Sequence, residues 1–89
     1  MTWKVLVKKS VFKNLRVLPR AVQLKFDALV KALIDAGASG PHGWQNYGKL
    51  SDNEYHCHLT HHYVACWRQE KNTIIIEVYY AGSRENAPY

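Results

Sequence analysis

Hydrophobic and polar residues alternate along four segments of the chain, as they do in strands that bury one face. Near the N-terminus, Trp3, Val5 and Val7 alternate with more polar neighbours. The other three segments follow one another in the last third of the chain, beginning with Tyr55-His56-Cys57-His58-Leu59. The pattern therefore predicts one strand at the start of the chain and three consecutive strands at its end.

Between these strands the apolar residues recur at helical spacing. Pro19 suits the first turn of a long helix, and Gly37 can adopt the left-handed conformation that ends it. A shorter helix is predicted from a cap at Ser10 through Arg16. The apolar stripe of the longer helix consists of Val22, Phe26, Leu29, Val30 and Leu33.

This order of elements predicts an α+β fold of the form β-α-α-β-β-β, in a single domain covering residues 1–89. We expect a mostly antiparallel four-stranded sheet with the two N-terminal helices packed on one face. Parallel pairing is expected only between the first and last strands, because the helices form that crossover. The predicted core comprises Phe26, Leu29, Leu33, Leu59, Ala65, Trp67, Ile76 and Val78.

The register of the first hairpin decides which side chains share a face, because a slip of one residue inverts every side chain. A three-residue loop at 60–62 groups the apolar residues Tyr55, Cys57, Leu59, Tyr63, Ala65 and Trp67. His56, His58, Val64, Cys66 and Arg68 then take the other face. On this register Cys57 and Cys66 cannot form a disulfide, which predicts free thiols in a reducing compartment.

A second turn is expected around Lys71-Asn72. It would place Ile74, Ile76, Val78 and Tyr80 on the apolar face. Glu77 and Tyr79 would then join His56 and His58 on the opposite, open face.

Composition narrows the classes of protein. The net charge of +5 makes a polyanion a plausible partner. The longest apolar run, 73–81, is too short to span a bilayer and contains Glu77, and the N-terminus lacks the pattern of a secretory signal. These features predict a cytoplasmic protein that does not contact a membrane.

Several motifs together resemble a known family. They are Lys49-Leu50 after the loop, the Y-x-C-x-L strand, the YVACW strand and the closing GSRENAPY. In this order of elements they resemble the RelE/ParE toxin superfamily of type II toxin–antitoxin systems, and in particular RelE-like mRNA interferases. RelE-type members cleave messenger RNA in the ribosomal A site, whereas ParE-type members inhibit DNA gyrase.

The resemblance implies candidate catalytic residues. His56 and His58 match alternating basic positions on the first strand after the helices, and Arg84 matches an arginine after the last strand. Tyr89 matches a C-terminal aromatic position, with a different spacing. The family's arginine near the start of the middle strand is replaced by Val64, and Arg68 is the candidate substitute.

The chemistry of these side chains fits cleavage of RNA by its own 2′-hydroxyl. Histidines can move protons near neutral pH, and Arg84 can bind phosphate through a planar fork. Tyr89 can stack on a base, and Lys49 and Arg68 can hold the RNA backbone.

Simpler explanations exist for several of these residues. A lone strand histidine is usually just solvated, and His61 and His62 are expected at an exposed hairpin tip. Glu77 is a second-rank general base and more often a charge partner of Arg68. No cysteine or carboxylate is placed to complete a metal site with the histidines, so no metal or other cofactor is expected. Trp44 and Tyr47 are expected to anchor their loop.

The sequence therefore predicts a ribosome-dependent endoribonuclease toxin. Its expected partners are messenger RNA on the ribosome and a cognate antitoxin protein, with which it would form a hetero-oligomer. Two alternatives stay open at this point: a ParE-like gyrase inhibitor that acts by binding, and a non-catalytic relative that only binds its antitoxin.

Overall fold

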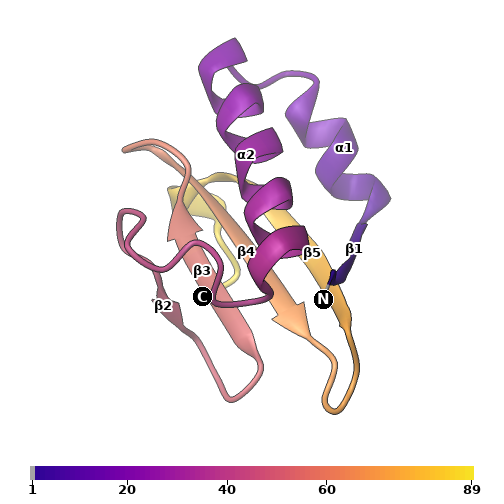
Figure 1. Ribbon diagram of the computed structural model, residues 1–89. Coiled ribbons are helices and arrows are strands. Elements are labelled where there is room, and N and C mark those ends of the chain that lie inside the picture. The colour runs from indigo at the N-terminus through magenta and orange to yellow at the C-terminus, as the bar shows by residue number, and fades with distance from the viewer. Residues whose placement is uncertain (1) are drawn as a thin grey trace.

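Two helices cover one face of a five-stranded sheet in the computed structural model, which describes residues 2–89 (Figure 1). The elements follow the order β1 (Lys4–Val7), α1 (Lys9–Leu15), α2 (Arg20–Ala36), β2 (Gly48–Lys49), β3 (Glu54–His58), β4 (Tyr63–Gln69) and β5 (Ile75–Ser83), with a closing 3-10 turn η1 (Arg84–Asn86). The predicted α+β class and the order of the four longer strands are confirmed.

The strands lie side by side in the order β1-β5-β4-β3-β2. Strands β1 and β5 are parallel, with Val5 opposite Ile76, and all other pairs are antiparallel. The two-residue strand β2 was not predicted, so the sheet has five strands where four were expected. It pairs Gly48 with His56 and Lys49 with Tyr55 at the edge of the sheet.

The helix ends follow local chemistry, with one exception. Pro19 precedes α2 as its N-cap with φ −54°, and Gly37 ends the helix with φ +82°, a conformation that favours glycine. The prediction that Ser10 caps α1 is wrong: Lys8 occupies the cap position and α1 begins at Lys9. Across residues 2–89, neither helix has the length and apolar content needed to cross a bilayer.

The core lies between α1, α2 and the facing side of the sheet. All eight residues predicted for the core are buried. Trp67 lies at its centre, where its Nε1 donates a hydrogen bond to the carbonyl of Ala38 at 3.1 Å. Tyr47 lies 6.3 Å from both the Tyr55 and the Trp67 rings, and Trp44 also packs on the core. The expectation that Trp44 and Tyr47 anchor their loop is confirmed.

The hairpin between β3 and β4 has the predicted three-residue loop. Leu59 donates its backbone N–H to Tyr63 at 2.8 Å, and His56 lies opposite Cys66 while Cys57 lies opposite Ala65. The two cysteines therefore point to opposite faces, and both are buried free thiols.

A β-bulge shifts the register between β4 and β5. Trp67 pairs with Val78 but Cys66 pairs with Tyr80, so Tyr79 is an extra residue on β5. Because Cys66 is on the histidine side, Tyr80 is too, and Ala81 takes the buried position facing the helices. The predicted place of Tyr80 on the apolar face is therefore wrong.

The start of β5 also differs from the prediction. Ile74 precedes the strand and is 48% exposed, so it does not join the apolar face as expected. Ile76 and Val78 do lie in the core, as predicted.

Candidate active site

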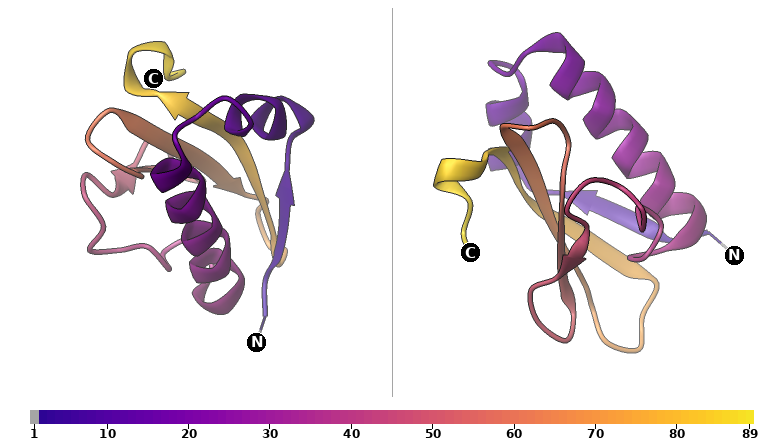
Figure 2. Two further views of the ribbon diagram at one scale, coloured as in Figure 1. Left: turned by 90° about the horizontal axis from the view of Figure 1, so that it is seen from above. Right: turned by 90° about the vertical axis from the view of Figure 1, so that its left-hand side faces the viewer.

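The sheet has a second face that the helices do not cover, here called the histidine face. Its residues come from β3, β4 and β5: Glu54, His56, His58, Val64, Cys66, Arg68, Glu77, Tyr79 and Tyr80. The C-terminal segment turns onto this side of the sheet, away from α2 (Figure 2, right). Side-chain alternation thus separates a packed face from one that carries most of the titratable groups.

His58 is held by the loop that precedes β2. Its backbone N–H donates to the carbonyl of Gln45 at 2.8 Å, and its ring Nε2 lies 3.1 Å from the side-chain nitrogen of Asn46. Only 7% of His58 is exposed, and its Nδ1 is buried without a hydrogen-bond partner among residues 2–89. His58 is therefore a fixed ring rather than a solvated one.

His56 lies on the same face and contacts the end of the chain. The ring of Tyr89 lies 4.8 Å from the His56 ring, centroid to centroid. Burial lowers the pKa of His56 below its usual 6.5, and the neighbouring His58 lowers it further. At neutral pH the His56 imidazole is therefore neutral and able to accept a proton.

Tyr89 reaches His56 through the turn that follows β5. The backbone N–H of Arg84 donates to the carbonyl of His62 at 2.9 Å, which fixes the start of this turn. Tyr89 is 54% exposed, and burial of its hydroxyl raises its pKa above 10.0. The phenol is thus neutral at physiological pH and can offer a ring face and an O–H donor.

Arg84 follows the end of β5 with an exposed side chain. It comes two residues after Gly82, which lies opposite Val64, and Val64 in turn lies opposite His58. Within residues 2–89 no carboxylate forms an ion pair with Arg84. Its guanidinium is available to an external anion at one end of the histidine face.

Arg68, by contrast, is already engaged. Its guanidinium lies 4.0 Å from a Glu54 oxygen, 3.8 Å from a Glu77 oxygen and 4.2 Å above the ring of Tyr79. The interpretation of Glu77 as a charge partner of Arg68 is confirmed. With two carboxylates beside it, Arg68 adds little positive charge to the face.

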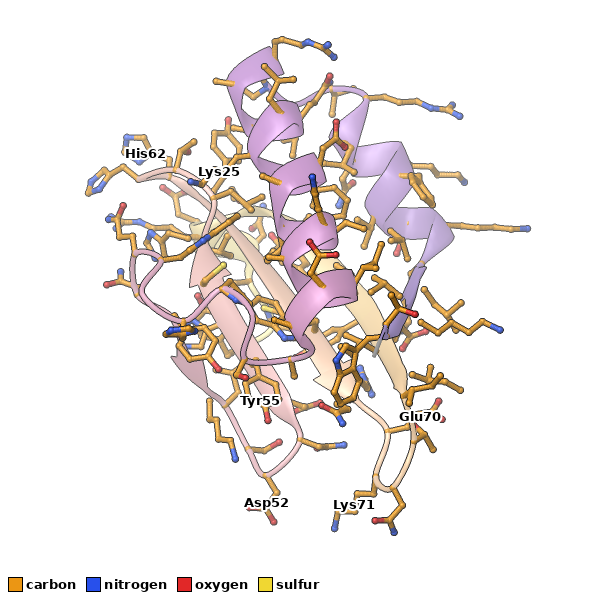
Figure 3. The ribbon with its side chains drawn as sticks, viewed as in Figure 1. Lys25, Asp52, Tyr55, His62, Glu70 and Lys71 are labelled. Atoms are coloured by element: carbon orange, nitrogen blue, oxygen red, sulfur yellow. The ribbon has the colours of Figure 1, made fainter. Side chains whose placement is uncertain are left out.

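Two of the sequence-predicted positions lie elsewhere. Lys49 pairs with Tyr55 across β2 and β3 and places its amine 5.6 Å from the Tyr55 ring, on the side of the helices. His61 and His62 are exposed at the tip of the β3–β4 hairpin, as expected, and His62 points away from the sheet (Figure 3). The structure thus brings together His56, His58 and Tyr89 and places Arg84 just after the end of β5, whereas Lys49 lies on the side of the helices.

Sequence reasoning missed two contributors. Asn46 contacts His58 from a loop, with φ +55°, and the Q-N-Y-G run around it is a turn-like signal that hints at this conformation. Tyr80 reaches the histidine face only through the bulge, which the sequence does not reveal. Its hydroxyl donates a hydrogen bond to the carbonyl of Ser83 at 2.6 Å and so stabilises the end of β5.

Comparison with known proteins finds similarity in structure but not in sequence. No protein-family model matches the sequence, and no curated protein is similar to it in sequence. Several solved structures are similar over nearly the whole chain, and three of them represent the group. RelE from Pyrococcus horikoshii, in complex with RelB, has a TM-score of 0.75 at 20% identity, covering 98% of this chain and 100% of that one.

The other two come from bacteria. A mutant of E. coli RelE in the free state has a TM-score of 0.73 at 12% identity, covering 98% of this chain and 88% of that one. The YoeB dimer from Staphylococcus aureus has a TM-score of 0.71 at 16% identity, covering 94% and 99%. At these identities the likeness concerns architecture: the chain has a RelE-like fold.

Proposed function

We propose that this chain is the toxin of a type II toxin–antitoxin system and acts as an endoribonuclease on messenger RNA at the ribosome. One observation carries the proposal: His56 and His58 lie together on the face of a RelE-like fold that the helices leave uncovered, and Arg84, which has no ion-pair partner among residues 2–89, follows β5 at the end of this face. A pair of imidazoles beside a free guanidinium has the components that cleavage of a phosphodiester requires.

The proposed reaction uses the 2′-hydroxyl of the RNA itself. The 2′ oxygen attacks the neighbouring phosphorus while His56 takes its proton, and the bond from phosphorus to the 5′ oxygen breaks. The 5′ oxygen leaves with a proton from the second histidine or from solvent, and a 2′,3′-cyclic phosphate remains. Arg84 stabilises the charge on the phosphate, and Tyr89 stacks on a base next to His56.

The test is substitution of the reacting groups. Replacing His58 or Arg84 by Ala should lower cleavage by on the order of a hundredfold or more and relieve growth inhibition. Cleavage is measured by primer extension on messenger RNA bound to programmed ribosomes. His61→Ala is the matched control, because it removes a histidine from an exposed hairpin tip. Toxicity that survives both substitutions in folded protein would contradict the nuclease proposal.

The proposed partner is an antitoxin with an acidic and apolar segment. The RelE and YoeB neighbours are seen in complexes with RelB and YefM, and this chain carries a net charge of +5. An acidic segment that covers the histidine face would block RNA directly. A small protein encoded by an adjoining reading frame should bind the chain, with affinity that falls as salt rises. Binding that leaves His56 and Tyr89 as exposed as they are in the free chain would rule out direct blockade.

A second function, inhibition of DNA gyrase by binding alone, is supported by one observation on β4. Val64 stands near the start of this strand, and Arg68, farther along, lies between two carboxylates. The middle strand therefore offers little positive charge for a phosphate. A supercoiling assay separates the two functions: the nuclease proposal expects no inhibition of gyrase, and the alternative expects inhibition that persists in His58→Ala.

A further inference from the structure

The loop before β2 contributes a side chain to the histidine face that no strand could supply. Asn46 adopts a left-handed conformation with φ +55°, which asparagine tolerates better than most residues. This turn aims its side-chain nitrogen at Nε2 of His58, 3.1 Å away. The same loop is tied to β3 by the hydrogen bond from the backbone N–H of His58 to Gln45. His58 is thus held by a backbone contact with Gln45 and a side-chain contact with Asn46.

This contact fixes the proton on the His58 ring. An amide nitrogen can only donate, so Nε2 of His58 must accept, and the neutral ring carries its proton on Nδ1. That Nδ1–H is buried and has no partner among residues 2–89. An unsatisfied buried donor costs stability, and such a group is typical of a site that is completed by a ligand. The missing partner of His58 is therefore a hydrogen-bond acceptor.

We propose that Asn46 is a positioning residue that holds His58 as a neutral Nδ1–H donor to a phosphate oxygen of the RNA. The inference rests on the proposed nuclease function and deepens it. His58 then stabilises charge through a hydrogen bond and does not transfer its proton. The proton for the leaving 5′ oxygen comes from solvent, and His56 alone acts as the base.

The environment of His56 supports this division of roles. Within residues 2–89 its ring contacts Tyr89 and not an amide donor like the one at His58, and its lowered pKa keeps it unprotonated at neutral pH. Two neighbouring histidines with different surroundings are the usual way in which a site separates a base from a donor. The His58 donor is buried in the free protein, so the phosphate reaches it only when the groups around it move.

The test replaces the hydrogen-bond donor at position 46 with an acceptor. Asn46→Asp has nearly the same shape and tolerates the same backbone conformation, but a carboxylate can only accept. His58 should therefore switch its proton to Nε2, which ring nitrogen chemical shifts report directly by NMR at pH 8. Cleavage on ribosomes should fall about a hundredfold or more, the typical effect of losing one preorganised donor. Asn46→Gly, which keeps the backbone conformation and removes the amide, should lose roughly tenfold.

Each outcome supports or overturns the proposed tautomer of His58 or its role in cleavage. A wild-type His58 protonated on Nε2, or an Asn46→Asp variant that keeps the proton on Nδ1, would overturn the assignment. A tautomer switch that leaves the cleavage rate within twofold would overturn the role in catalysis. Retention of the amide-exchange protection of the His58 N–H shows that the loop is still folded. If wild-type protein cleaves no RNA, the nuclease proposal fails, while the NMR result still decides whether Asn46 sets the His58 tautomer.

Discussion

The two faces of the sheet are built from the same strands but carry different side chains: one face is apolar and packed against the helices, and the other carries titratable groups. The face under the helices is filled with residues such as Trp67, Ile76 and Val78, all at 0% exposure. The histidine face carries two histidines, two carboxylates, tyrosines and an arginine. Along β3, for example, Cys57 points into the core between His56 and His58, which do not.

The difference extends to hydrogen bonding. Three buried side-chain atoms lack a hydrogen-bond partner within residues 2–89: Nδ1 of His56, Nδ1 of His58 and Nε of Arg68. All three lie on the histidine face. Buried polar atoms without hydrogen bonds cost stability, so the two faces also differ in how well their polar groups are satisfied.

The strongest way to test the contrast is to disturb the packed face. Trp67→Ala removes a fully buried ring and its hydrogen bond to Ala38, and should lower the free energy of unfolding by about 3–5 kcal/mol. Urea unfolding followed by circular dichroism measures this loss. His58→Ala should cost less stability than Trp67→Ala, because it removes a smaller buried ring, while lowering cleavage by on the order of a hundredfold or more. Equal destabilisation by both substitutions would mean that the two faces do not differ as described.

A smaller effect is expected from the titration of His56. Because its folded pKa is lowered below the unfolded value of 6.5, the unfolded chain binds the proton more readily. The contribution of His56 to stability is therefore complete above about pH 6.5 and declines as pH falls from there toward the folded pKa. The melting temperature of wild-type protein should fall more steeply from pH 7.5 to pH 5 than that of His56→Gln. Parallel pH profiles would show that the ring is not desolvated.

The contact with Tyr89 can sharpen this result. Tyr89→Ala removes the ring that lies 4.8 Å from His56 and should return the pKa of His56 toward its ordinary value. NMR titration of the His56 ring measures this change. Stability should change little, because more than half of Tyr89 is exposed. An unchanged His56 pKa would assign its burial to the neighbouring strands and not to the tail.

The smallest effect is expected at the ion pairs of Arg68. About a third of each side chain in the Arg68–Glu77 pair is exposed, so solvent screens the interaction. A double-mutant cycle with Arg68→Met and Glu77→Gln should give a coupling of about 0.2–1 kcal/mol. A coupling several times larger would mean that the histidine face contributes to stability as the core does.

The sequence predicted the packed face better than the histidine face, for a physical reason. A run such as 55–59 admits only one register that buries its apolar side chains, and the three-residue loop at 60–62 followed from that. Tyr80 was misplaced because a tyrosine suits either face, so its pattern could not reveal the bulge. Lys49 was grouped with the histidines because a two-residue strand leaves no periodicity to detect.

The contact between Asn46 and His58 could not be predicted from a local sequence pattern. It depends on where a loop returns in space, and the two residues belong to different elements. The same holds for Tyr89, whose place on His56 depends on the turn that begins at Arg84. The candidate histidines themselves were identified from their alternation on one strand, which is a local feature.

The parallel pairing of β1 with β5 has a consequence for how the molecule is made. The ribosome releases β1 early, but its neighbour in the sheet is the last strand to emerge, since Val5 lies opposite Ile76. Such a distant contact is slow to form and cannot form at all on a partly synthesised chain. The newborn polypeptide therefore exposes unpaired backbone and apolar surface until β5 has emerged from the ribosome, an interval in which a chaperone or a partner already present in the cell can meet it first.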